Sequence, residues 1–171
     1  MVEIEAKILE IDVGKVQKQL KNLGAKKVFE GDMPTYWFDF EDNSLKKKGQ
    51  LLRLRKKGDN TELTFKEKIS KNDVKIMEEI ESLICDGEKF KQILEAVGFK
   101  VAGYFIKHRI SYKLEGFSFE LDTFENIPTF LEIEGPSEEK IFEMAQKLGF
   151  KKSDLKSWTG KDVLEYYKKK I

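Results

Sequence analysis

The sequence predicts an α+β fold in which a closed β-barrel points charged side chains inward and packs helices against its outside. Strands such as the one over residues 2–8 alternate apolar and charged side chains with period two, which gives each strand one apolar and one charged face. On most of these strands the charged face repeats one sign, although like charges gain nothing from such pairing on a solvated face. Three helices with apolar stripes need a partner, and the apolar outer faces of the strands would supply it. Any single strand, taken alone, also fits an ordinary antiparallel sheet with one solvated face.

Length and composition are those of one ordinary domain. The chain has 171 residues, enough for a single domain over 1–171 with a sizeable core. Charged residues make up 37% of the chain, yet the formal net charge is only +1. With a sequence pI near 7.7, the chain lacks the overall basic field that nucleic-acid binding favours, so we expect no nucleic-acid partner.

The only cysteine is Cys85, which excludes an intrachain disulfide and which we expect to be a buried thiol. The chain begins directly on a charged strand without a signal peptide, and no apolar run approaches membrane-spanning length. We therefore expect a soluble cytoplasmic protein without a membrane partner. A homodimer is the default assembly for such a protein.

Apolar periodicity and turn residues divide the first half of the chain into elements. A helix is expected after Asp12, an N-cap residue, with Val16 and Leu20 on its apolar face and Gly24 at its end. The other predicted elements are an extended stretch over 26–39, a loop over 41–49, strands over 50–56 and 63–68 around a turn at 58–60, a turn over 70–73 and a strand over 74–84.

The second half continues the alternation of helices and strands. Asp86 is expected to cap a helix that ends at Gly98. The inward face of this helix is expected to hold Phe90, Ile93, Leu94 and Val97. The other predicted elements are strands over 100–113, 117–124 and 130–134, a helix that starts at Pro136 and ends at Gly149, and an amphipathic helix over 155–170.

One short pattern occurs three times. An acid-x-acid strand leads through a helix to Gly-x-Lys, starting from Glu3-Ile4-Glu5, Glu79-Ile80-Glu81 and Glu132-Ile133-Glu134. Because each match covers only a few residues, an internal repeat and chance similarity both stay open.

The charged faces of the strands carry the chemistry. The acidic members are Glu3, Glu5, Glu79, Glu81, Glu120, Asp122, Glu132 and Glu134, and the basic members are Lys7, Arg53, Arg55, Lys66, Lys68, Lys107 and Arg109. A barrel interior lined with charged side chains is expected to bind a charged ligand, because buried ions are costly unless they are paired or coordinated. Lysine and arginine bind phosphate oxygens, and carboxylates bind Mg²⁺ or Mn²⁺, which also binds phosphate. The predicted ligand is therefore a triphosphate or similar polyphosphate, with Mg²⁺ or Mn²⁺ as the cofactor.

These residues resemble the CYTH domain, the family of triphosphate tunnel metalloenzymes. The resemblance runs through Glu3-x-Glu5-x-Lys7, Leu52-Arg53-Leu54-Arg55, Lys66-Glu67-Lys68, Glu79-x-Glu81, Lys107-His108-Arg109, Leu121-Asp122 and Leu131-Glu132-Ile133-Glu134. It implies an eight-stranded antiparallel β-barrel that encloses a tunnel. The roles it implies are triphosphate binding by Lys7, Arg53, Arg55, Lys66, Lys68, Lys107 and Arg109, metal binding by Glu3, Glu5, Asp122, Glu132 and Glu134, and catalysis by Lys7, Glu79 and Glu81.

The same resemblance implies an activity and its alternatives. The compact form of this chain is similar to the class IV adenylyl cyclases, which convert ATP to cyclic AMP and pyrophosphate. The alternatives are a triphosphatase acting on thiamine triphosphate, inorganic triphosphate or a nucleoside triphosphate, and a polyphosphate-binding module without catalysis. One position departs from the family: Met77 stands where relatives often carry arginine, so one phosphate contact is either missing or supplied by Lys75.

Some residues that often carry function are expected to be structural here. His108 alternates with Lys107 and Arg109, which places it on the outer face of its strand. Tyr36 and Trp37 are more often core residues than platforms for a nucleobase. Trp158 and the tyrosines 166–167 are expected to pack the last helix against the barrel.

Overall fold

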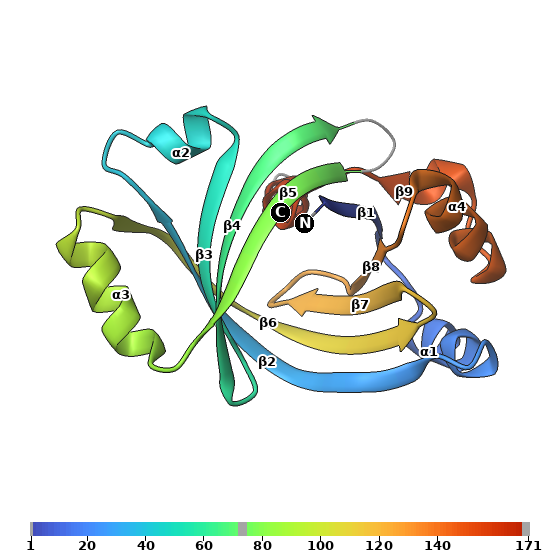
Figure 1. Cartoon of the computed structure of the whole chain (residues 1–171). Coiled ribbons are helices and arrows are strands. Elements are labelled where there is room, and N and C mark those ends of the chain that lie inside the picture. The colour runs from blue at the N-terminus through green and yellow to red at the C-terminus, as the bar shows by residue number, and fades with distance from the viewer. Residues whose placement is uncertain (1, 72–74, 169–171) are drawn as a thin grey trace. The chain divides into compact units, whose positions relative to one another are not determined.

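The computed structural model describes residues 2–71 and 75–168 (Figure 1). Its strands are β1 (Val2–Ile8), β2 (Lys26–Asp39), β3 (Gln50–Lys57), β4 (Asn60–Lys71), β5 (Lys75–Ile84), β6 (Lys100–Leu114), β7 (Phe117–Phe124), β8 (Phe130–Glu134) and β9 (Leu155–Lys156). Its helices are α1 (Val13–Asn22), α2 (Ser44–Lys47), α3 (Gly87–Ala96), α4 (Glu138–Lys147) and α5 (Gly160–Lys168), with a 3₁₀ turn over Lys152–Asp154. None of the helices in the described ranges is long and apolar enough to cross a membrane.

Hydrogen bonds order the strands as β5-β4-β3-β2-β6-β7-β8-β1-β9, and a further pairing joins β5 to β1. Eight strands therefore form a closed ring, and the short β9 adds to β1. The registers between β2 and β3, β3 and β4, β7 and β8, and β1 and β8 are all antiparallel. The predicted α+β fold, a closed eight-stranded antiparallel β-barrel with helices, is confirmed.

The contacts within the chain define two compact units, which are described separately. Among the described residues, unit 1 comprises residue 2, 31–69 and 77–107, and unit 2 comprises 3–30, 70–71, 75–76 and 108–168. Strands β2 and β6 each contribute residues to both units.

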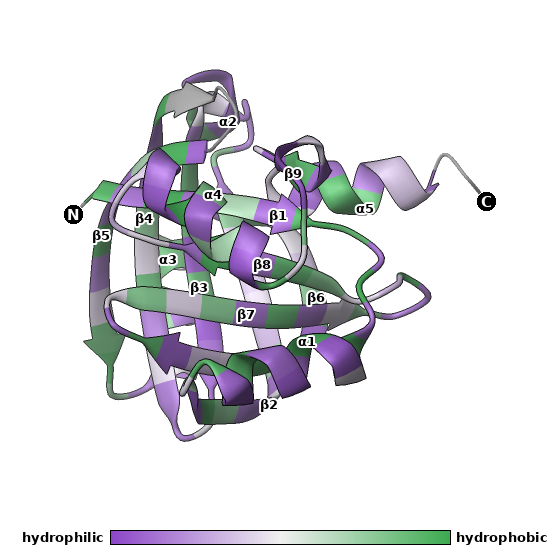
Figure 2. Cartoon of the chain, turned by 90° about the vertical axis from the view of Figure 1, so that its right-hand side faces the viewer, coloured by the Kyte–Doolittle hydropathy of each residue, from purple (hydrophilic) through white to green (hydrophobic). Residues whose placement is uncertain are grey.

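In unit 2, α1 and α4 cover the apolar face of β1, β7 and β8. Figure 2 shows both helices on the viewer's side of these strands. Leu20 of α1 and Ile141 of α4 share one buried cluster with Ala6, Phe119 and Ile133 of the strands. All five side chains are at most 1% exposed. Burial of this apolar area provides the main force that attaches the helices to the strands.

The ends of these helices follow from local sequence. Asp12 accepts a hydrogen bond from the backbone N–H of Lys15 at 3.0 Å, and Ser137 accepts one from Lys140 at 3.3 Å. Each side chain thus satisfies a backbone donor that the first turn leaves without a partner. Gly149 follows α4 at φ +80°, a left-handed conformation that glycine adopts at little cost.

In unit 1, α3 packs on a second apolar cluster. Leu94 is buried with Phe38, Leu52 and Leu54, and Phe90 packs against the same cluster. The prediction that Ile93 and Val97 share this inward face is wrong. Ile93 is 54% exposed and Val97 is 64% exposed, because α3 contacts the strands through a stripe narrower than its apolar residues suggest.

Three local predictions need correction. The loop predicted over 41–49 contains the short helix α2, whose backbone donors at Leu45 and Lys46 bond the Asp39 carboxylate at 2.9 and 3.0 Å. The tail is not helical from Leu155, because that residue pairs with β1 and the helix begins only at Gly160. Cys85 is exposed rather than buried, since it lies between the end of β5 and the N-cap of α3.

Two predictions concern residues outside the described ranges. The turn predicted over 70–73 overlaps residues 72–74, and the predicted start of the following strand at 74 also lies outside the described residues. Residues 169–171 at the end of the predicted tail helix lie outside them as well.

Candidate active site: two clusters of charged side chains

Strands β1, β7 and β8 of unit 2 bring acidic side chains together on one face. Register pairs Glu5 with Glu134 and Lys7 with Glu132, and it pairs Glu132 with Glu120 on the other side. Alternation puts these side chains opposite the apolar residues that contact α1 and α4. A slip of one residue would bury charge in the apolar cluster, so the hydrophobic pattern itself fixes this register.

Lys7 is the central cation of this face. Its ammonium group lies 2.8 Å from Glu5 Oε1 and 2.5 Å from Glu132 Oε2, and its side chain is 2% exposed. Burial alone would lower the pKa of Lys7, but the charges and hydrogen bonds of Glu132 and Glu5 outweigh it and raise that pKa above its ordinary value. Lys75 contacts the same Glu5 oxygen at 2.7 Å, so one carboxylate serves two ammonium groups.

Arg109 is the second strong cation of unit 2. Its Nε and Nη2 atoms each lie 2.5 Å from an oxygen of Asp122, and Nη2 also lies 3.4 Å from Glu132 Oε1. Burial alone would lower the pKa of Arg109, but Asp122, with Glu120 and Glu132, raises it well above its ordinary value. The fork geometry fixes the guanidinium plane, as is usual for arginine paired with a carboxylate in two places.

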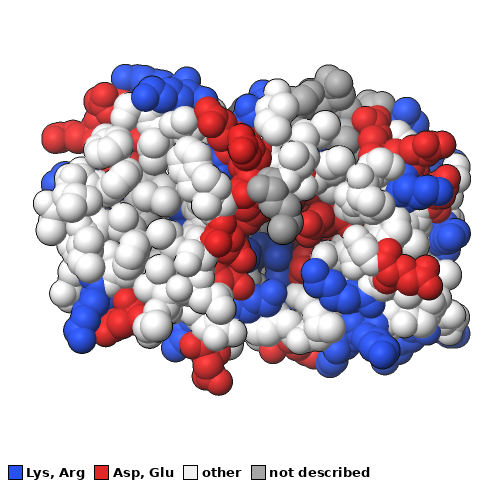
Figure 3. Space-filling model, viewed as in Figure 1, with Lys and Arg blue, Asp and Glu red and all other residues white. Residues whose placement is uncertain are grey.

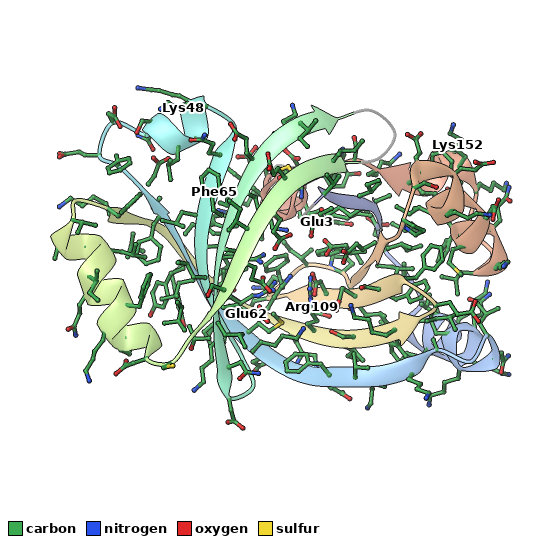
Figure 4. All side chains as sticks on the ribbon, in the orientation of Figure 1. Glu3, Lys48, Glu62, Phe65, Arg109 and Lys152 are labelled. Carbon is green, nitrogen blue, oxygen red and sulfur yellow. The ribbon has the colours of Figure 1, made fainter. Side chains whose placement is uncertain are left out.

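We call these residues the Lys7 cluster: Glu3, Glu5, Lys7, Lys75, Arg109, Glu120, Asp122, Glu132 and Glu134. Its nine side chains comprise six carboxylates and three cations, which leaves a formal excess of three negative charges. Figure 4 shows the labelled Glu3 and Arg109 side chains on the side of these strands away from α1 and α4. Ser111, on the same face of β6 as Arg109, donates a short hydrogen bond to Glu120.

Unit 1 holds a second charged group, which we call the Arg53 cluster: Arg53, Arg55, Glu62, Thr64, Lys66, Glu79 and Glu81. Arg55 contacts Glu62 through Nε at 2.9 Å and Nη2 at 2.5 Å, and Lys66 contacts Glu79 at 2.9 Å. Burial alone would raise the pKa of Glu62, but the charge and hydrogen bonds of Arg55 outweigh it and hold that pKa below its ordinary value. The three cations and three carboxylates of this cluster balance formally.

Arg53 differs from Arg55 in the length of its ion pairs. Its Nη2 atom lies 4.0 Å from Glu79 Oε1 and 3.8 Å from Glu81 Oε2, and it donates a hydrogen bond to the Thr64 hydroxyl at 3.0 Å. Thr64 in turn donates to Glu81 at 3.0 Å. At these distances Arg53 interacts less strongly with Glu79 and Glu81 than Arg55 does with Glu62.

All but two of the sequence-predicted site residues belong to one of the two clusters. Lys68 and Lys107 are in neither cluster: Lys68 is exposed, and Lys107 is half-buried on the strand face it shares with Arg109. His108 is exposed on the opposite face, 3.9 Å from Glu30, as alternation predicts. Figure 3 shows acidic and basic side chains interspersed over the viewed face, in line with the small net charge.

The structure adds residues that sequence reasoning did not place in the site. Lys75 is buried against Glu5, although the sequence offered it only as a substitute for an arginine at position 77. Glu62 was missed because the strand was expected to begin at 63. The alternation of Glu62, Thr64 and Lys66 is the signal that would have found it.

The carboxylates of the Lys7 cluster fit a hard divalent cation by their chemistry, since Mg²⁺ and Mn²⁺ select oxygen ligands. Their excess of negative charge provides a reason for such an ion to bind. Within the described part of the chain, no three His, Cys, Asp or Glu side chains are arranged to hold a metal ion, and lysine and arginine groups lie between the carboxylates instead. A metal ion would therefore enter by replacing some of these ion pairs.

Comparison with known proteins shows the family to which the chain is similar. Residues 1–167 match the family model of the CYTH domain. A protein of Methanocaldococcus jannaschii named "putative adenylate cyclase" is 36% identical over 138 residues, which are 78% of this chain and 77% of that protein. The structure of the PH1012 protein from Pyrococcus horikoshii is similar with a TM-score of 0.80 and 27% identity, covering 94% of this chain and 98% of that one.

Two more distant structures share the fold. A "putative adenylate cyclase" from Vibrio parahaemolyticus has a TM-score of 0.86 at 18% identity, covering 96% of this chain and 98% of that one. A Hippeastrum protein described as a "putative adenylyl cyclase" with a dominant triphosphatase activity has a TM-score of 0.69 at 21% identity, covering 92% and 91%. Because residues 1–167 match the family model, this chain belongs to the CYTH domain family.

Proposed function

We propose that the protein is a metal-dependent enzyme that acts on a triphosphate, and that its reaction is the conversion of ATP to cyclic AMP and pyrophosphate. The observation that carries this proposal is the chemistry of the two clusters: the Lys7 cluster has surplus carboxylates, and the Arg53 cluster holds two arginines and a lysine with an equal number of carboxylates. The name of the Methanocaldococcus jannaschii relative supports cyclisation as the reaction.

The proposed roles of the residues follow from their charge. Arg53, Arg55 and Lys66 would bind phosphate oxygens, with Lys68, Lys107 and Arg109 as further contacts. Lys7 stays protonated because its pKa is raised, so it would act as a fixed positive charge at phosphate rather than as a base. Arg109, held in place by Asp122, would do the same with a fixed orientation. Glu79 and Glu81 would position the basic groups and the nucleophile.

The proposed metal ligands are Glu3, Glu5, Asp122, Glu132 and Glu134. When bound there, Mg²⁺ or Mn²⁺ would polarise phosphoryl oxygens and favour the ionised form of the nucleophile. In the cyclase reaction the 3′-hydroxyl oxygen of ATP bonds to the α-phosphorus, and the bond from that phosphorus to the pyrophosphate oxygen breaks. The hydroxyl proton is released to solvent or to a carboxylate, and pyrophosphate leaves.

A triphosphatase is the second candidate, favoured by the activity described for the Hippeastrum protein that shares the fold. In that reaction water attacks a terminal phosphorus of thiamine triphosphate, inorganic triphosphate or a nucleoside triphosphate. The same charged groups serve both reactions. They differ in which phosphorus faces the nucleophile.

The test offers ATP, inorganic triphosphate and thiamine triphosphate separately to the purified chain, each with Mg²⁺ or Mn²⁺, and separates the products by chromatography. Cyclic AMP with pyrophosphate supports the cyclase. Orthophosphate from ATP without cyclic AMP refutes the cyclase and supports the triphosphatase. Tight binding without any product supports a non-catalytic polyphosphate-binding module and refutes both enzymes.

Glu5→Gln provides the matched variant for this assay. It removes one charge from the cluster at nearly constant volume, so metal-dependent turnover should be lost while the far-ultraviolet circular dichroism spectrum is kept. Glu78→Gln is the control, because Glu78 is an exposed acid of β5 outside both clusters. Full activity in Glu5→Gln would refute the proposed metal ligands.

A further inference from the structure

The aromatic side chain of Trp37 on β2 lies beside the arginine-bearing face of β3. Trp37 has Arg53 as its register partner on β3, while Thr35 pairs with Arg55. Strand alternation puts Trp37 on the same face of β2 as Thr35. Trp37 is half-buried, and it is not among the members of the two apolar clusters described above. The sequence favoured a core role for Trp37, and its register places it beside Arg53, for which we propose phosphate binding.

A second ring completes an aromatic surface in unit 1. The rings of Trp37 and Phe105 have centroids 4.7 Å apart and meet at 62°, the edge-to-face geometry that aromatic pairs favour. Gly103, two residues before Phe105, would place an added Cβ only 3.2 Å from an indole carbon of Trp37. The absence of a side chain at Gly103 therefore lets the indole lie against the backbone of β6.

The polar neighbours of Trp37 on its other side form a row suited to phosphate. Arg53 donates to Thr64, and Thr64 donates to Glu81 on the next strand. Nη2 of Arg53 lies 3.8 Å from Glu81 and 4.0 Å from Glu79, so these contacts are weaker than the 2.5 Å contact of Arg55 with Glu62. An aromatic surface and an arginine thus lie side by side on one face of unit 1.

We propose that the Trp37–Phe105 pair binds the planar aromatic group of the substrate. The substrate class is then a triphosphate that carries an aromatic ring system, such as a nucleoside triphosphate, rather than inorganic triphosphate. This inference rests on the proposed function, because it assumes that Arg53 binds phosphate. Stacking on an aromatic side chain tolerates different bases, since every base has a π-face. The Trp37–Phe105 surface should therefore favour triphosphates with an aromatic ring over those without one, and should discriminate less between different rings.

Binding measurements with four ligands test this inference by titration calorimetry: ATP, CTP, thiamine triphosphate and inorganic triphosphate. The wild-type chain should bind a ring-bearing triphosphate at least about five-fold more tightly than inorganic triphosphate. Trp37→Leu should remove that preference and leave the affinity for inorganic triphosphate unchanged. Gly103→Ala should weaken the same preference without deleting the ring, because its Cβ displaces the indole.

Two further variants keep the test decisive. Trp158→Phe leaves Trp37 as the only tryptophan, so ring-bearing ligands should quench its fluorescence while inorganic triphosphate does not. Tyr104→Leu is the matched control: Tyr104 is 52% exposed on β6 and its ring packs against that of Tyr36, so its removal should change neither affinity.

The outcomes separate the two proposals. If no triphosphate binds, the proposed function fails. If inorganic triphosphate binds as tightly as ATP in the wild type, or if Trp37→Leu weakens all four ligands equally, Trp37 is structural and the aromatic-surface proposal is overturned while the proposed function stands. The most tightly bound of ATP, CTP and thiamine triphosphate then identifies the aromatic group that the site prefers.

Discussion

Arg53 and Arg55 lie on the same face of β3 but differ in their contacts with carboxylates. The Nη2 atom of Arg53 donates to the neutral Thr64 hydroxyl at 3.0 Å and lies 4.0 Å from Glu79 and 3.8 Å from Glu81. Arg55, two residues on, has instead a tight double contact with Glu62. The two arginines of one strand face therefore differ in the length of these carboxylate contacts.

Arg53→Ala should weaken the binding of inorganic triphosphate by about 1.5–3 kcal/mol, the value of a hydrogen bond to a charged group. Titration calorimetry with the purified chain measures this loss. Lys89→Ala is the control, because the side chain of Lys89 is 80% exposed on α3 and belongs to neither cluster. An equal loss of affinity in both variants would mean that only the overall charge of the chain matters.

Glu62→Gln should reduce stability in a way that depends on pH. The folded-state pKa of Glu62 lies below its ordinary value, so its contribution is complete above about pH 4.5 and is lost as the pH falls through the folded pKa. The variant should be less stable by about 1.5–3 kcal/mol at pH 7, and the difference should shrink below about pH 4.5. Urea unfolding at several pH values measures it. A difference that widens on acidification would contradict the assignment.

At the scale of elements, α3 shows that apolar residues at helical spacing do not all face inward. Leu94→Ala should cost about 2–5 kcal/mol, because it leaves a cavity in the cluster with Phe38, Leu52 and Leu54. Ile93→Ala, one residue away, should cost far less because Ile93 is 54% exposed. Thermal or urea unfolding of the two variants gives the comparison. Equal costs would mean that Ile93 is covered in solution.

The sequence predicted most helix ends because their signals are local. Asp12 and Ser137 cap α1 and α4 by bonding a backbone N–H three residues on. Helix α2 escaped prediction because Asp39, which accepts from Leu45 and Lys46, lies well before the helix starts. The start of the tail could not be predicted either, since Leu155 is extended only through its pairing with β1. A cap residue within one turn of the helix can be predicted from the sequence, whereas a hydrogen-bond partner farther along the chain cannot.

The threefold strand–helix pattern keeps its regularity in the structure. Helices α1, α3 and α4 follow β1, β5 and β8, and each has ten residues. The glycine after each helix has a positive φ, at +86°, +105° and +80°. Each of the three helices therefore ends at a glycine with a positive φ. This regularity fits both an internal repeat and independent use of the same helix-end residues.

At the scale of the whole molecule, the charge is nearly balanced overall but unevenly distributed. The chain carries a formal net charge of +1, while the nine residues of the Lys7 cluster hold three more carboxylates than cations. Sequence reasoning found the members of this set other than Lys75 from alternation and sign. It could not assign partners such as Lys75 to Glu5, because seventy residues separate them in the chain.

Mg²⁺ or Mn²⁺ should therefore stabilise the folded chain. An ion that binds only the folded state at 100 times its dissociation constant adds about 2.7 kcal/mol to the free energy of unfolding. Thermal unfolding with and without the ion, at matched ionic strength, measures the gain, and a chelator should reverse it. Glu5→Gln should lower the gain and Glu78→Gln should keep it. An unchanged gain in Glu5→Gln would place the metal elsewhere.

The pairing of Lys7 also has a consequence for chemical modification. Acylating reagents attack the neutral amine, and the Lys7 amine is both 2% exposed and held in its protonated form by Glu5 and Glu132. Solvated amines such as that of Lys89 are expected to react first. The protein can therefore be dye-labelled or coupled to a support through its surface lysines under mild conditions, while the amine at the centre of the Lys7 cluster stays unmodified.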